Sequence, residues 1–84
     1  MSYLVEWDKN SYKFLEKLPL NICERILKKI DELKEEPFRY LEHFERKNYY
    51  KFRIGDYRAL IDIDLQNKIL TIQVLDKRGR VYKR

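Results

Sequence analysis

The sequence has almost none of the residues that cross-link small proteins. It contains one cysteine, Cys23, and one histidine, His43. A single cysteine excludes an internal disulfide, and the Cys/His spacing of a structural zinc site is missing. We therefore predict a chain without a metal ion or cofactor, held together by its apolar core. Cys23 is expected in that core, and His43 is expected to be a packing or surface residue rather than a catalyst.

Long apolar runs are also missing. No stretch approaches the length of a membrane span, and the N-terminus has no signal-peptide pattern, so we expect a cytoplasmic protein. Hydrophobic residues make up 44% of the 84 positions, which is too apolar for a disordered chain. A chain of this length is expected to form one domain, residues 1–84, near the lower limit of what buries a core unaided.

The positive charge is concentrated in two places. Nineteen Lys and Arg against fourteen Asp and Glu give a net charge of +5 and a pI near 9.4, which favours polyanionic partners such as nucleic acid. Segment 77–84 holds five cations and no acidic residue. The second concentration lies in segment 49–58, whereas segment 24–36 mixes both signs.

The N-terminal half predicts a strand followed by two helices. Segment 3–7 alternates weakly and suits a short first strand. Asp8 or Asn10 can cap a helix that ends at Pro19, and a second helix is predicted over 20–36, where Pro37 stops it. The apolar positions of the second helix recur at helical spacing: Ile22, Ile26, Ile30 and Leu33, flanked by Cys23 and Leu27. We expect the two helices to form a hairpin over one face of a sheet.

The dipeptide Gly55-Asp56 predicts a tight hairpin turn of the primed type, because it separates two runs rich in aromatic and β-branched residues. This loop pairs Arg53 with Arg58 and Lys51 with Leu60, and side chains alternate between the two faces. One face then forms the core: Tyr50, Phe52, Ile54, Tyr57, Ala59, Ile61 and Ile63. The opposite face carries Tyr49, Lys51, Arg53, Arg58, Leu60 and Asp62.

A third meander strand follows a turn at Gln66-Asn67. Segment 68–76 alternates, with Leu70, Ile72 and Val74 predicted on one side. Segment 37–47 has no clean periodicity and receives no assignment. The predicted fold is α+β: an N-terminal strand, a helical hairpin and a three-stranded antiparallel meander, with the helices packed on one sheet face. The place of the first strand in the sheet does not follow from the sequence.

Three cations gather on the face of the hairpin that points away from the core. Two arginines directly opposite each other weaken a sheet, so a fold selected only for stability would alternate the signs here. The arrangement suggests that an anion, such as a phosphate, supplies the counter-charge. The alternative is an ordinary solvated strand face in a basic protein, where screening keeps the repulsion small.

The chain resembles the RelE/ParE superfamily of toxins, and within it the RelE type. The resemblance rests on the strand, helical hairpin and meander, on the motif from Tyr50 to Arg58, and on Lys77-Arg78 followed by Tyr82. It implies a toxin of a type II toxin–antitoxin system, a ribosome-dependent endoribonuclease that cuts mRNA without metal, using the RNA 2′-hydroxyl as nucleophile. The implied partners are a RelB-like antitoxin, the ribosome and mRNA.

The resemblance also implies roles for individual residues. Lys51 and Arg53 stand where the RelE pattern has two strand lysines, and Arg58 matches the arginine of its Tyr-Arg pair. A guanidinium is too hard to deprotonate to act as a base, so that role falls to Lys51 or Tyr82. The spacing from Arg78 to Tyr82 is two residues shorter than in the pattern, which makes Arg80 an alternative to Arg78. The predicted catalytic residues are Lys51, Arg53, Arg58, Arg78 and Tyr82, and the predicted RNA-binding residues are Tyr49, Lys77 and Arg80.

Two other functions are compatible with these sequence features. A ParE-like toxin has the same fold and binds a topoisomerase, although the basic cluster is not expected there. A non-catalytic RNA- or ribosome-binding module would use the same cations to hold phosphates. Aromatic residues outside the regular elements, such as Phe38, Tyr40 and Phe44, indicate an apolar surface for the antitoxin, which we expect to be acidic and partly helical.

Overall fold

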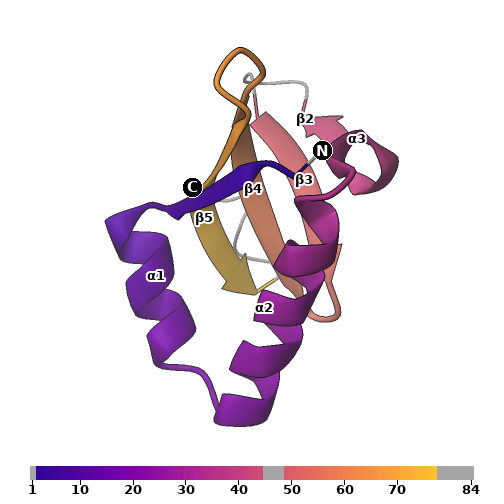
Figure 1. Cartoon of the computed structure of the whole chain (residues 1–84). Coiled ribbons are helices and arrows are strands. Elements are labelled where there is room, and N and C mark those ends of the chain that lie inside the picture. Colours follow the sequence, from indigo (N-terminus) through magenta and orange to yellow (C-terminus); the bar gives the residue numbers. More distant parts are fainter. Residues whose placement is uncertain (1, 45–48, 78–84) are drawn as a thin grey trace.

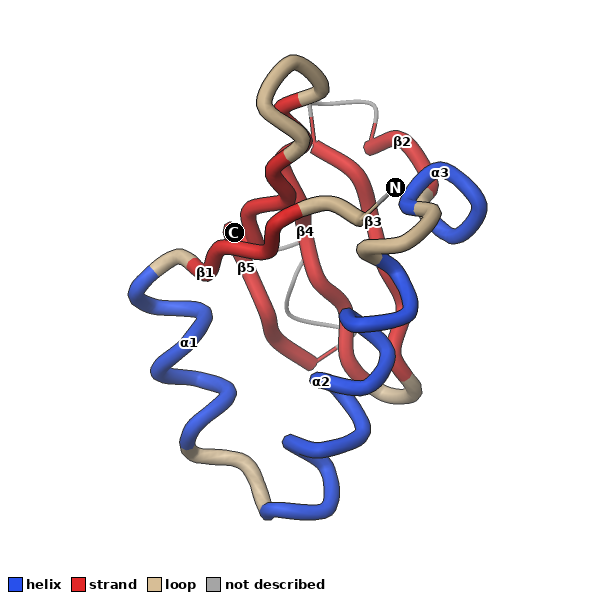
Figure 2. Tube along the Cα trace, in the orientation of Figure 1, coloured by secondary structure: helices blue, strands red, loops and turns tan. Residues whose placement is uncertain are grey.

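A computed structural model describes residues 2–44 and 49–77 of the chain. Figure 1 shows two helices lying over one face of a five-stranded sheet whose strand order is β1-β5-β4-β3-β2. Figure 2 shows the same arrangement by element type. The elements in chain order are β1 (Leu4–Trp7), α1 (Lys9–Glu16), α2 (Leu20–Leu33), α3 (Pro37–Tyr40), β2 (Glu42–Phe44), β3 (Tyr49–Ile54), β4 (Tyr57–Asp64) and β5 (Ile69–Lys77). The α+β class and the helical hairpin over one sheet face are confirmed.

Local sequence signals set the limits of the helices. Asp8 caps α1, its carboxylate accepting a hydrogen bond from the backbone N–H of Asn10 at 3.0 Å. Pro19 immediately precedes α2. The predicted end of this helix at Glu36 is wrong, because α2 ends at Leu33. The residue before a proline is pushed out of the helical region, and Glu36 accordingly has φ −145° and ψ 75°. Neither these helices nor α3 is long and apolar enough to cross a membrane.

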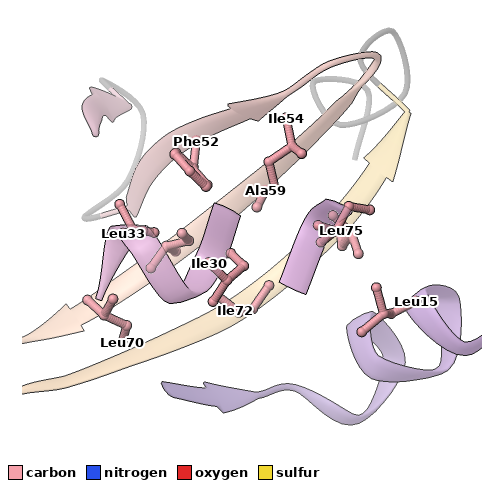
Figure 3. Close-up of a cluster of buried hydrophobic side chains, with 11 residues drawn as sticks. Leu15, Ile30, Leu33, Phe52, Ile54, Ala59, Leu70, Ile72 and Leu75 are labelled. Carbon is pink, nitrogen blue, oxygen red and sulfur yellow. The ribbon is translucent and has the colours of Figure 1, made fainter. Parts of the chain in front are cut away.

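The core lies between the helices and the sheet. Figure 3 shows Ile30 and Leu33 of α2 directed toward side chains of the strands, with Leu15 of α1 beside Leu75. Cys23 packs against this core, as predicted. The buried members are Leu15, Ile26, Ile30, Leu33, Phe52, Ile54, Ala59, Ile61, Leu70, Ile72 and Leu75.

The hairpin of β3 and β4 has the predicted register. Arg53 pairs with Arg58, and Lys51 pairs with Leu60. Gly55 has φ +56°, whereas the φ of Asp56 is negative. A positive φ followed by a negative one is the pattern of a type II′ turn. The hairpin therefore places its cations on the side of the sheet opposite the helices.

A bulge in β5 overturns the prediction for Val74. Leu60 pairs with Val74 and Ile61 pairs with Ile72, so Gln73 is the extra residue. An inserted residue reverses the alternation that follows it. Val74 consequently shares the face of Leu60, away from the helices, and Leu75 fills the core position instead.

The structure adds two features that the sequence did not assign. Segment 37–44 forms α3 and β2, and β2 pairs antiparallel with β3. At the other edge, β1 pairs parallel with β5. Ser11 ties the start of α1 to that edge, since its buried hydroxyl lies 2.7 Å from the carbonyl of Ile72 and 2.8 Å from that of Asp8. One hydroxyl proton serves one of these two acceptors at a time.

We expect Gly55→Ala to destabilise the fold through backbone strain rather than steric overlap. An added Cβ would have Arg25 Nη1 as its nearest neighbour, at 3.8 Å, an ordinary contact. A left-handed conformation with a Cβ costs about 1–2 kcal/mol, which should appear as a lower urea midpoint at unchanged slope. Asp56→Ala, at a negative φ in the same turn, is the control and should leave the midpoint nearly unchanged.

A second stability test concerns the link between α1 and the sheet. Ser11→Ala removes the buried hydroxyl, and the loss of one hydrogen bond of about 1 kcal/mol lowers Tm by about 4–8 °C in a domain of this size. Asn10→Ala, on the exposed side of α1, should change Tm little. Equal Tm values for both variants would mean that the Ser11 hydroxyl does not anchor α1.

Candidate functional site

A shallow hollow opens on the sheet face opposite the helices. It has a volume of about 300 Å³. We call it the cationic hollow; its lining residues are Tyr40, Glu42, Lys51, Arg53 and Arg58. It therefore unites the three cations predicted from the hairpin with two residues from α3 and β2.

Strand pairing explains why these side chains meet. Lys51 and Arg53 are two residues apart on β3 and so point to the same side of the sheet. Arg58 lies directly across from Arg53, where opposite Cβ atoms are about 5 Å apart. Glu42 lies directly across from Lys51 on the outer side of β3. Leu60 of β4 lies directly across from Lys51 on the other side of β3 from Glu42. It is only 6% exposed and adds an apolar side chain to this face of the sheet.

The structure supplies carboxylates for two of the three cations. The ammonium of Lys51 lies 3.6 Å from Glu42 Oε2, and the lysine side chain is 26% exposed against 76% for the glutamate. Asp76 is the strand partner of Arg58 and is 1% exposed; its Oδ1 accepts a hydrogen bond from the backbone N–H of Lys77 at 2.7 Å. The repulsion between Arg53 and Arg58 is thus moderated by protein carboxylates as well as by any bound anion.

Arg53 differs from its neighbours. Its side chain is exposed, and within the described part of the chain no carboxylate lies within ion-pairing distance of it. By contrast, the Nε atom of Arg58 is buried. The hollow therefore combines a guanidinium set into the sheet with one that extends into solvent, an arrangement able to grip a phosphate from two sides.

Of the other predicted site residues that the structure describes, neither Tyr49 nor Lys77 lines the cationic hollow. Tyr49 is half-buried and lies on the same face as Lys51 but outside the lining. Lys77 pairs with Tyr57 and lines a separate hollow with Ile22 on the helix side of the sheet. The predictions for Arg78, Arg80 and Tyr82 fall outside the described residues.

His43 is also separated from the cations. Its ring meets that of Tyr50 edge-on with 5.4 Å between centroids, and it pairs with Tyr50 across β2 and β3. Because it alternates with Glu42, its side chain points to the helix side of the sheet. His43 is exposed and contacts this one ring, which agrees with the surface or packing residue expected from the sequence. The described residues hold no group of three or more His, Cys, Asp or Glu placed to bind a metal ion.

Sequence reasoning missed three residues of this region: Tyr40, Glu42 and Asp76. The first two belong to the segment without periodicity, whose short edge strand is stabilised by pairing with β3 rather than by its own pattern. Asp76 follows the apolar run of β5 directly, and it falls opposite Arg58 only because of the bulge at Gln73, which the sequence pattern did not reveal.

Comparisons with known proteins match both this sequence and this fold. A family model described as the ParE toxin of the type II toxin–antitoxin system parDE matches residues 5–82. The RelE–RelB complex of Pyrococcus horikoshii OT3 contains a chain with 31% identity and a TM-score of 0.81, covering 95% of this chain and 99% of that one. The RelBE2 toxin–antitoxin complex of Mycobacterium tuberculosis gives 27% identity and a TM-score of 0.84, with coverages of 93% and 100%.

The isolated RelE toxin of Escherichia coli is 22% identical with a TM-score of 0.76, covering 98% of this chain and 93% of that one, which is a likeness of fold. The comparison with curated proteins found no match. The family model nonetheless spans nearly all of the sequence, and the archaeal relative is matched over almost its whole length. The chain therefore belongs to the ParE toxin family of type II toxin–antitoxin systems, within the RelE/ParE superfamily, and it has the fold of RelE toxins.

Proposed function

We propose that this toxin is a ribosome-dependent endoribonuclease of the RelE type, which cleaves mRNA without metal and so stops translation in the cytoplasm. The observation that carries the proposal is the convergence of Lys51, Arg53 and Arg58 on one hollow. Attack of a 2′-hydroxyl on the adjacent phosphorus builds negative charge on the equatorial oxygens. Fixed cations aimed at that charge lower the barrier without a metal ion.

The three cations have distinct roles in this proposal. Arg53 and Arg58 bind the scissile phosphate, and their fixed separation across the hairpin suits its two non-bridging oxygens. Lys51, paired with Glu42, presents its ammonium at the edge of the same hollow and adds a third positive charge. Arg78 or Arg80 is assigned to the leaving oxygen, and Tyr82 to proton removal or to stacking on a base.

We further propose that a RelB-like antitoxin, acidic and partly helical, covers this region. The archaeal relative is from a RelE–RelB complex and the mycobacterial one from the RelBE2 toxin–antitoxin complex, which supports an antitoxin partner here. The surface chemistry is compatible with a protein partner, since Phe38 is 52% exposed and Tyr40 47% exposed on the short helix beside the hollow. An acidic chain would complement a protein with a net charge of +5.

A ParE-like action on a topoisomerase is the second candidate, because the matching family model is described as ParE. The cationic hollow counts against it, since binding a protein target does not require three cations around one hollow. The two candidates differ in their target and can be separated with the same protein preparation.

The proposal predicts cuts within codons when a translated message is probed by primer extension after adding the toxin. Arg58→Ala should reduce cleavage by about 100-fold or more, the usual cost of one transition-state donor. The control is Arg39→Ala, which removes the same charge from an exposed site where the guanidinium lies 3.6 Å from Glu36. Full cleavage by Arg58→Ala would exclude this arginine from the site.

The topoisomerase candidate makes the opposite prediction. If the wild type leaves the message intact and inhibits DNA supercoiling by a purified bacterial type II topoisomerase, the ribonuclease proposal is wrong. We expect instead that supercoiling proceeds normally at toxin concentrations that cleave ribosome-bound mRNA.

A further inference from the structure

We propose that a second hollow, between α2 and the outer edge of β3, binds a phosphate of the cleaved RNA strand next to the scissile one. The inference rests on the proposed ribonuclease function and adds to it residues of α2 and α3, outside the hairpin. We call this second hollow the edge hollow; its volume is about 320 Å³. The lining residues that bear on the proposal are Arg25, Lys29 and Glu32 of α2, Tyr40 of α3, and Arg53 and Gly55 of the hairpin.

The edge hollow adjoins the cationic hollow, because Arg53 and Tyr40 line both of them. It opens where the sheet ends. Among the described strands, β2 pairs with β3 as far as Lys51, and no strand lies beside residues 52–54 on the side of β3 away from β4. Figure 1 shows α2 beside this end of β3. An RNA strand bound in the cationic hollow can therefore continue over the edge of the sheet into the edge hollow.

Cations outnumber carboxylates in the edge hollow. Arg25, Lys29 and Arg53 line it, and Glu32 is the one acidic side chain among its described lining residues. The ammonium of Lys29 lies 4.0 Å from Glu32 Oε2, and the two side chains are 53% and 46% exposed, so this ion pair is weak. Within the described ranges, neither Arg25 nor Arg53 has a carboxylate at ion-pairing distance. Arg25 is thus available to an anion.

The helix and the hairpin turn together position the two cations of α2. Arg25 and Lys29 are both exposed and four residues apart, a spacing at which Cβ atoms are about 6 Å from each other. The guanidinium of Arg25 lies over the turn, since a Cβ built on Gly55 would be 3.8 Å from Arg25 Nη1. A glycine in the turn therefore leaves space beside this guanidinium. A guanidinium and an ammonium at this spacing can hold one phosphate between them.

Tyr40 lies where the two hollows meet and offers a surface for a base. It is 47% exposed on the short helix α3. Exposed aromatic rings are common stacking surfaces for unpaired RNA bases. With one phosphate on Arg53 and the next on Arg25 and Lys29, the base between them would stack on Tyr40.

The shared lining favours the cleaved strand over a second RNA as the source of this phosphate. Arg53 belongs to both hollows, so anions bound in them would be near neighbours, as successive phosphates of one strand are. Ribosomal RNA carries the same phosphate chemistry and is the alternative source. The two sources differ in their response to a change in the message.

The test is single-turnover cleavage on ribosomes programmed with a synthetic message. We expect Arg25→Ala/Lys29→Ala to need about 10-fold more toxin for half-maximal cleavage, because charge-assisted hydrogen bonds to a phosphate are lost. The rate at saturating toxin should stay within about threefold of wild type, since the hairpin arginines remain. The matched control Lys13→Ala/Lys28→Ala also removes two exposed helix cations, which line other hollows, and should behave as wild type.

A message with one neutral methylphosphonate identifies the phosphate that is bound. Neutralising one of the two phosphates that flank the scissile one should raise the half-maximal toxin concentration of the wild type by about 10-fold. The same message should cost Arg25→Ala/Lys29→Ala nothing further, because the contact is already lost. Fully additive penalties at both flanking phosphates would place the α2 cations on ribosomal RNA and overturn the proposal. An unchanged half-maximal concentration for the double variant would overturn it as well.

The ribonuclease function is read separately from the wild type. Cleavage of the unmodified message by the wild type, abolished by a 2′-deoxy nucleotide at the cut site, supports that function whatever the double variant does. Absence of wild-type cleavage rejects the function and this inference together, whereas wild-type behaviour of Arg25→Ala/Lys29→Ala rejects the inference alone.

Discussion

The pairing of β3 with β4 through the Gly55-Asp56 turn is the constraint on which the rest of the structure depends. The side-chain period of a strand is two, so a slip of one residue would exchange the two faces of the hairpin. Phe52 and Ala59 would then face solvent, and Arg53 and Arg58 would enter the core. A turn that requires a left-handed glycine therefore sets both the packing of the helices and the position of the cations.

The electrostatics of the hollow follow from this register together with the two neighbouring strands. β2 brings Glu42 to Lys51, and β5 brings Asp76 to Arg58. The two carboxylates are in different environments, because one is mostly exposed and the other is buried. A buried carboxylate beside an arginine suits a role in orienting that side chain, whereas the exposed Glu42 pairs with the Lys51 ammonium at the edge of the hollow.

The proposed function requires a protein that binds RNA and stays folded without it, and the charges around the hollow suit both requirements. Around the hollow itself, Lys51, Arg53 and Arg58 outnumber the carboxylates of Glu42 and Asp76. Each carboxylate limits the repulsion that an unmatched cluster would impose on a small domain. In the proposed function, Arg53 is the cation most open to an incoming phosphate, because its side chain is exposed. Binding by the antitoxin and binding by RNA would compete for the same surface.

The amino-acid sequence by itself determined the hairpin register, the helix caps at Asp8 and Pro19, and most of the core. These features depend on interactions between residues close in the chain, where turn chemistry and periodicity carry the information. The tertiary structure decided the parallel docking of β1, the pairing of β2 and the bulge at Gln73. Short edge strands are stabilised by the backbone groups of a distant partner, and a bulge breaks the alternation used to assign faces. Glu42 could be placed beside Lys51 only once that long-range pairing was known.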